Sequence, residues 1–169
     1  MLPNKLRIGE ELHALAQASL GLGNVGYASA ASMGYWTRVS NLKAVKQWLA
    51  MPWGQSEVTV TNRCRDRRCG WDRCSPGKTM RCDLLSGANG VRHVGEMKFT
   101  FGKLAPWLHG GGQTEAELQL AHYCQAVCET THATTSGSVL VVAMNLDEHH
   151  DVTHSRARII ELPVSYSLR

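Results

Sequence analysis

Four of the six cysteines fall within one short stretch, with four, four and seven residues between successive members: Cys64, Cys69, Cys74 and Cys82. Structural zinc prefers four soft ligands in a tetrahedron, and short connections let one chain segment wrap the ion. Gly70 and the Pro76-Gly77 pair supply the tight turns that such wrapping needs. The spacing therefore predicts a structural zinc site that uses these four cysteines and leaves no ligand position open for water.

The same stretch also concentrates positive charge. Residues 63–82 hold six arginines and one lysine against two aspartates, a formal charge of +5, whereas the whole chain carries +4. A local charge of this size favours an acidic partner, and nucleic acid is the first choice because Lys and Arg neutralise phosphates. The predicted partner-binding residues are Arg63, Arg65, Arg67, Arg68, Arg73, Lys78 and Arg81. Metal binding would be coupled to the folding of this basic loop.

A second group of potential ligands lies on a predicted helix at 114–130 and just beyond it. After His122, the residues Cys124, Cys128 and His132 follow at four-residue spacing, which places the two cysteines on one helix face. They form a candidate second metal site, or they add ligands to the first. The alternative is a buried apolar stripe, since free cysteine is among the most buried residue types.

The segment 145–154 is rich in imidazole and carboxylate groups. Such side chains bind Zn, Mn or Fe, and a site with open positions would permit hydrolysis. The spacing matches no specific metalloenzyme motif, so a polar hairpin loop is the competing interpretation. The residues concerned are Asp147, Glu148, His149, His150, Asp151 and His154.

The remaining pattern predicts an α+β fold. We expect a small antiparallel sheet, about three helices and a metal-stapled Cys-rich loop, because the segments do not alternate as βαβ units. Residues 1–169 are predicted to form a single domain, with 62–83 as a zinc-binding basic insertion. The expected helices cover 5–22, 41–51 and 114–130, and the expected strands cover 57–61, 97–101, 139–144, 158–162 and 164–168.

No apolar run approaches the ~20 residues that a membrane span needs. The N-terminal residues also lack the basic-then-apolar order of a signal peptide. We therefore expect a cytoplasmic, reducing location, where clustered cysteines bind metal more often than they form disulfides. Three disulfides in a secreted protein, or free thiols, are the alternative.

These observations favour a zinc-stabilised nucleic-acid-binding or transcription-associated accessory protein, such as a DNA-binding regulatory protein, over an enzyme. The basic Cys-rich loop would contact phosphates. No nucleophile elbow, kinase signature or paired-carboxylate motif stands out. Two alternatives stay open. One is a protein-binding module or inhibitor that docks its arginines on an acidic protein surface, and the other is a small metal-dependent nuclease that uses the 147–154 segment.

Overall fold

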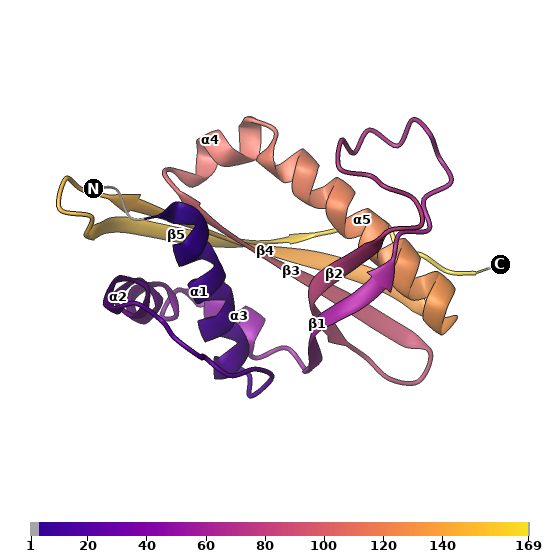
Figure 1. The fold of residues 1–169 in the computed structure, drawn as a ribbon, viewed down its shortest axis with the longest axis horizontal. Helices are drawn as coiled ribbons and strands as arrows, with labels where there is room; N and C mark the ends of the chain where they lie inside the picture. The colour runs from indigo at the N-terminus through magenta and orange to yellow at the C-terminus, as the bar shows by residue number, and fades with distance from the viewer. Residues whose placement is uncertain (1–3, 169) are drawn as a thin grey trace. The chain divides into compact units, whose positions relative to one another are not determined.

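A computed structural model describes residues 4–168 (Figure 1). These residues fold into five helices and five strands. The helices are α1 (Lys5–Ser19), α2 (Ala30–Val39), α3 (Lys43–Leu49), α4 (Leu104–His109) and α5 (Gly112–Thr131). The strands are β1 (Trp53–Thr61), β2 (Thr79–Ser86), β3 (Val91–Phe101), β4 (Thr134–Leu146) and β5 (Val152–Glu161).

The strands form one mixed sheet in the order β1-β2-β3-β4-β5. The β1–β2 and β2–β3 pairs are antiparallel. β3 and β4 are parallel, because Thr134 N donates to Gly90 O at their first ends and Gly102 N donates to Met144 O at their last ends. Parallel strands need a long crossover connection, which α4 and α5 supply.

This topology corrects the predicted small antiparallel sheet with about three helices. The α+β class holds, but the sheet is mixed and larger, and there are five helices. α2 was not among the expected helices, and Ser29 caps it by accepting from Ser32 N. α4 was also not expected, and it contains Pro106 in its first turn, where proline is tolerated.

The chain divides into two compact units, each assembled from three segments. Unit 1 contains the chain up to Met51, then Met97–Gly110 and Leu140–Ile159, and unit 2 contains Pro52–Glu96, Gly111–Val139 and the chain from Ile160. The basic stretch belongs to unit 2, where residues 62–78 connect β1 to β2. A single domain with 62–83 as an insertion stays a prediction.

Unit 2 buries its core where α5 packs on the sheet. Leu120, Cys124 and Val127 of α5 are almost completely inaccessible to solvent. Gly137 of β4 permits this close approach, since a Cβ atom there would lie 2.7 Å from Cys124 Sγ and 2.8 Å from Leu120 Cδ1. α5 is therefore held directly against the sheet, which fixes the positions of the polar side chains that it carries.

Unit 1 packs α1 against α2, with Leu12 and Val39 fully buried. The carboxylate of Glu11 links these helices. Its Oε2 accepts from Ser29 N at 2.9 Å and from Ser29 Oγ at 2.6 Å, and its Oε1 accepts from Arg7 Nε at 2.8 Å. The hydrogen bond from the Ser29 side chain is the main cause that lowers the pKa of Glu11 to about 2.

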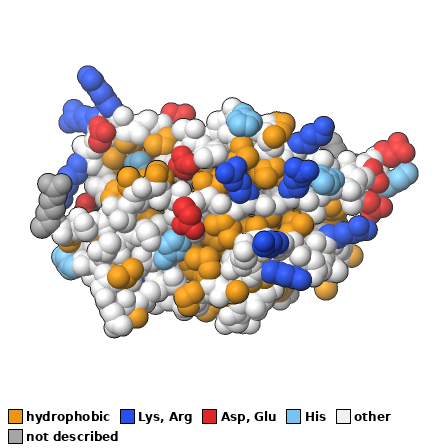
Figure 2. All heavy atoms as spheres, turned by 180° about the vertical axis from the view of Figure 1, so that it is seen from behind, with side chains coloured by type: hydrophobic (Ala, Val, Ile, Leu, Met, Phe, Trp, Pro, Cys, Tyr) orange, Lys and Arg blue, Asp and Glu red, His pale blue; other side chains and the backbone are white. Residues whose placement is uncertain are grey.

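No helix within residues 4–168 is long and apolar enough to cross a membrane. Hydrophobic side chains do remain at the surface, where Figure 2 shows them among Lys and Arg side chains. The most exposed large ones in unit 1 are Leu6, Tyr27 and Met33.

We expect Glu11→Gln to lower the free energy of unfolding at pH 7 by about 1–3 kcal/mol, because charge-assisted hydrogen bonds are lost. The folded-state pKa of Glu11 is depressed, so its contribution is full above the ordinary value near 4.5 and is lost as pH falls toward about 2. Urea unfolding at pH 7 and pH 3 measures this change. Glu10→Gln, at an exposed neighbour, is the control. A difference between Glu11→Gln and wild type that does not shrink at pH 3 would contradict the assignment.

Candidate functional site

Three cysteines and one histidine of unit 2 meet in space. The ligand atoms of Cys64, Cys69, Cys74 and His122 all lie within 4.8 Å of one another. The cysteines come from the β1–β2 connection and the histidine comes from α5. Cys64 and His122 are buried, and the other two are half-buried. Sulfur and imidazole nitrogen in this arrangement suit a tetrahedral ion, so the four residues can hold a metal ion.

The orientation of His122 supports this assignment. Its Nδ1 lies 2.6 Å from Leu118 O, so Nδ1 carries the proton and Nε2 is the free acceptor. That Nε2 atom is buried and has no hydrogen-bond partner among residues 4–168. Leaving a buried polar atom unpaired costs about 1–3 kcal/mol. A metal ion beside the three sulfurs would satisfy it, and the Leu118 carbonyl already fixes the ring as a metal ligand requires.

Asn62 holds the two ends of the β1–β2 connection together. Its side chain accepts from Cys64 N at 2.9 Å and donates to Cys74 Sγ at 3.4 Å. Its backbone N donates to Lys78 O, and its backbone O accepts from Gly77 N. Because Asn62 is almost fully buried, these bonds are shielded from water and pin two of the three sulfur ligands.

Trp71 packs beside the cluster. Its ring lies 4.7 Å from the ring of His122, tilted by 47°. Its carbonyl accepts from Cys74 N at 2.9 Å, which closes a tight turn between two ligands. The indole therefore forms a small apolar cover over the imidazole, as well as part of the loop framework.

The thiols of the cluster differ in acidity when no metal is bound. Burial raises the pKa of Cys64, whereas a backbone hydrogen bond from Trp71 lowers the pKa of Cys69. Metal ligation requires thiolates, so metal binding would release protons and would strengthen as pH rises.

The structure does not bring Cys82 into this cluster. It lies in β2, and Cys82 Sγ donates to Val58 O at 3.4 Å on the neighbouring strand. Burial is the main cause that raises its pKa to about 12. The fourth position belongs to His122, which the sequence offered only as a neighbour of the second group.

The second group is not assembled as a metal site in the described chain. Cys124 and Cys128 are buried in α5, and Cys124 Sγ donates to Ser136 O at 3.3 Å. His132 is exposed at the end of the helix with a left-handed φ of 56°. All six cysteines are free thiols rather than disulfides.

Most of the predicted partner-binding residues project into solvent. Two of them form ion pairs, Arg81 Nε with Glu57 Oε2 at 2.6 Å and Arg73 Nε with Glu115 Oε1 at 3.4 Å. The remaining five are exposed and form no ion pair with residues 4–168: Arg63, Arg65, Arg67, Arg68 and Lys78. A positive surface therefore surrounds the metal cluster.

The 147–154 segment of unit 1 contains the turn between β4 and β5. Asp147 Oδ1 accepts from His149 N and from Asp151 N, both at 2.9 Å. The hydrogen bond from the Asp151 backbone is the main cause that lowers the pKa of Asp147. Within the described chain this segment forms no group of three ligand atoms. Its carboxylate instead stabilises a polar hairpin turn.

A carboxylate pair that sequence analysis missed lies on β2 and β3 of unit 2. In the register of these strands Leu84 lies opposite Gly95, and Asp83 and Glu96 are the next residues of the two strands. Asp83 N donates to Glu96 Oε1 at 3.1 Å. Glu96 is only 3% exposed. Carboxylate oxygens are the ligands that divalent ions such as Mg²⁺ prefer.

Tyr123 of α5 is buried in the same unit. Its hydroxyl accepts from Gln119 Nε2 at 2.8 Å. Burial and then the negative charge of Glu96 raise the pKa of Tyr123. Tyr123 directly follows His122, so α5 presents a metal ligand and a neighbour of the carboxylates at adjacent positions.

The sequence signal for this pair is the order Asp83, Glu96, Lys98, which sequence analysis missed. The last two residues are separated by one position of β3, and alternate residues of a strand share a face. The pattern becomes visible only when β2 is recognised as a strand that pairs with β3. The predicted metal-binding loop includes Cys82 and so covers part of β2, which was therefore not predicted as a strand.

A solved structure with a similar fold comes from Eubacterium rectale and is described as a "Putative exonuclease". The TM-score is 0.56 at 15% sequence identity, and the match covers 92% of this chain. This chain spans 57% of that protein's chain. At such low identity the likeness shows the fold alone. No protein-family model and no curated protein sequence matches this chain.

We expect the purified protein to retain about one metal ion per chain, and His122→Ala or Cys69→Ser to lose most of it because a ligand is removed. Elemental analysis of protein prepared without chelators measures the metal content. Cys82→Ser is the matched control and should keep the ion, since Cys82 lies outside the cluster. Loss of metal in Cys82→Ser with retention in His122→Ala would reverse the assignment.

Proposed function

We propose that this protein is a metal-dependent nuclease that binds nucleic acid through its basic Cys-rich loop. The observation that carries the proposal is the juxtaposition of Asp83 and Glu96 on paired strands, with Glu96 buried. It is an enzymatic function at a site other than 147–154, where sequence analysis had put the nuclease alternative.

The chemistry of the pair suits phosphodiester hydrolysis. Asp83 and Glu96 would provide oxygen ligands, which Mg²⁺ and Mn²⁺ prefer. Such an ion, when bound, activates water and stabilises the charge that develops on the phosphate. Lys98 lies two residues along β3 on the same strand face as Glu96, where an ammonium group adds to that stabilisation.

The fold likeness to a protein described as an exonuclease supports this class of reaction. Because this chain spans 57% of that protein and shares 15% identity, the support comes from the arrangement of elements alone. The carboxylate pair of this chain provides the independent argument.

We further propose that Cys64, Cys69, Cys74 and His122 hold Zn²⁺. Three thiolates and one imidazole form a closed tetrahedral site that leaves no position for water, so this ion is structural. It ties the basic loop to α5 at the residue before Tyr123. The loop would then bind phosphates beside the carboxylate pair of the same unit.

The loop supplies affinity rather than sequence selection. Arg67, Arg68 and Trp71 line one hollow of the loop, which Asp66 and Asp72 also line. Guanidinium groups bind phosphates, and an aromatic ring can stack on a base. Phosphate contacts position a protein on nucleic acid without reading its bases.

We expect wild-type protein with Mg²⁺ or Mn²⁺ to cleave labelled DNA or RNA oligonucleotides, and Asp83→Asn or Glu96→Gln to slow cleavage by about 100-fold or more. Glu129→Gln, a change of the same type on α5 and away from the carboxylate pair, is the control. Gel analysis of the products measures the rate, and metal analysis checks that zinc is retained. Nucleic-acid binding without cleavage by wild-type protein would instead indicate a binding protein.

We expect the double variant Arg67→Ala, Arg68→Ala to bind oligonucleotides more weakly and with less dependence on salt, because two phosphate contacts are removed. For duplex DNA the slope of log K against log salt should fall by about 1.8. Fluorescence anisotropy over a salt series measures both quantities. An unchanged slope would contradict the assignment of the loop as a phosphate-binding surface.

A further inference from the structure

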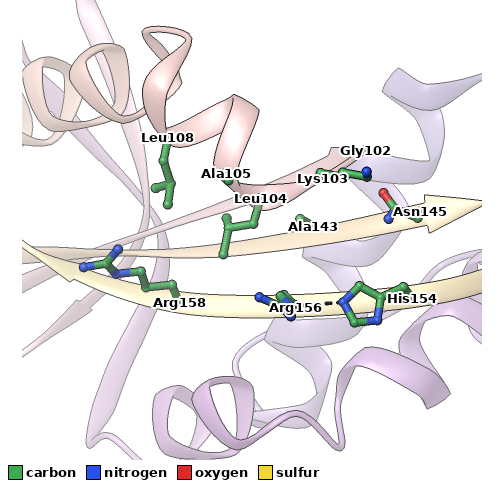
Figure 3. A pocket seen from close by; sticks show the side chains of 10 residues that line it. All are labelled: Gly102, Lys103, Leu104, Ala105, Leu108, Ala143, Asn145, His154, Arg156 and Arg158. Carbon is green, nitrogen blue, oxygen red and sulfur yellow. Dashed lines mark hydrogen bonds between the residues drawn. The ribbon is translucent and has the colours of Figure 1, made fainter.

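Unit 1 contains a cavity of about 510 Å³ that the proposed chemistry does not use. It lies beside α4, β4 and β5, and Figure 3 shows Leu104 and Leu108 of α4 pointing into it. Ala143 of β4 completes the apolar part of the wall. The volume falls within the range of about 300–1,000 Å³ that is usual for small-ligand sites.

The rest of the wall is basic. His154, Arg156 and Arg158 alternate along β5 and therefore share one strand face. Lys103 contributes a further cation, and no acidic residue lines the cavity. Arg156 Nε donates to His154 Nε2 at 3.0 Å, which holds one guanidinium group at the rim.

The two arginines of the cavity wall are not neutralised by acidic side chains of the described chain. Within residues 4–168, Arg156 and Arg158 form no ion pair with a carboxylate, and both side chains are exposed. Two uncompensated guanidinium groups beside an apolar wall fit a ligand that combines negative groups with a flat ring. Guanidinium groups bind phosphate through paired N–H donors. The amide of Asn145, also in the wall, can hydrogen-bond to the edge of such a ring.

We propose that this cavity binds a segment of single-stranded nucleic acid. One base lies against Leu104, Leu108 and Ala143, and the flanking phosphates contact Arg156 and Arg158. A duplex stacks its bases against one another and cannot offer a base face to the wall, whereas an unpaired strand can. The inference rests on the proposed function only for the choice of nucleic acid as the ligand. The residues involved are separate from Asp83 and Glu96.

The test compares Arg156→Gln, Arg158→Gln with Arg38→Gln, Lys43→Gln in the full-length chain. Both double variants remove two exposed positive charges from unit 1, but only the first pair lines the cavity. Binding of a fluorescein-labelled oligo(dT) and of a labelled duplex is measured by anisotropy without added Mg²⁺, so that cleavage does not interfere. Thermal unfolding checks that each variant is folded.

We expect the cavity variant to bind oligo(dT) about tenfold more weakly and the slope of log K against log salt to fall by about 1.4. The control variant should lose less affinity, and the cavity variant should lose less affinity for the duplex than for oligo(dT). Equal losses in the two variants, or equal losses for the two ligands, would overturn the proposal. An abasic strand that binds as tightly as oligo(dT) would also overturn it.

Cleavage assays separate this inference from the proposed function. If Asp83→Asn abolishes cleavage while the cavity variant binds oligo(dT) like wild type, the cavity proposal fails and the nuclease proposal stands. If the cavity variant weakens binding as expected but wild-type protein does not cleave, or Asp83→Asn cleaves like wild type, the cavity proposal stands and the proposed nuclease site fails.

Discussion

The unpaired Nε2 of His122 is the constraint on which the account of unit 2 depends. It is buried next to three cysteine sulfurs, and its ring is already fixed by the Leu118 carbonyl. A buried polar atom in this state is stable only with a partner, and a metal ion is the partner that the donor set selects. Through that ion, the β1–β2 connection would be fastened to α5, and the next residue of α5 is Tyr123 beside the carboxylates.

Positive and negative side chains lie in different parts of unit 2. The β1–β2 connection carries exposed cations that only partly pair with acidic side chains, whereas Asp83 and Glu96 form a compact negative site. A polyanionic substrate would be attracted by the first and would require a divalent ion at the second, since phosphate and carboxylate repel each other. Under the proposed function, the loop would bind phosphates and the carboxylates would hold the ion.

Sequence reasoning identified the cluster from local spacing but could not identify its last ligand. Cys64, Cys69 and Cys74 are close in the chain, so one loop gathers them, whereas His122 arrives from a distant helix through packing at Gly137. The acidic pair was not predicted for a similar reason, because only the pairing of β2 with β3 brings Asp83 and Glu96 together. The β4 strand was predictable from its apolar run, and a helix was expected over 114–130, although α5 begins at Gly112 without a side-chain cap. Parallel pairing of β3 with β4 was not, since it depends on the crossover.

Anomalous diffraction from crystals grown with Mn²⁺, recorded at the zinc and manganese edges, tests the two-site account most directly. The account predicts a zinc peak bonded to three sulfurs and His122 Nε2, and a manganese peak between the carboxylates of Asp83 and Glu96. Zinc–sulfur distances should be about 2.3 Å and the zinc–nitrogen distance about 2.0 Å. A zinc ion bound by Cys82 in place of His122, or no manganese at the carboxylates, would contradict it.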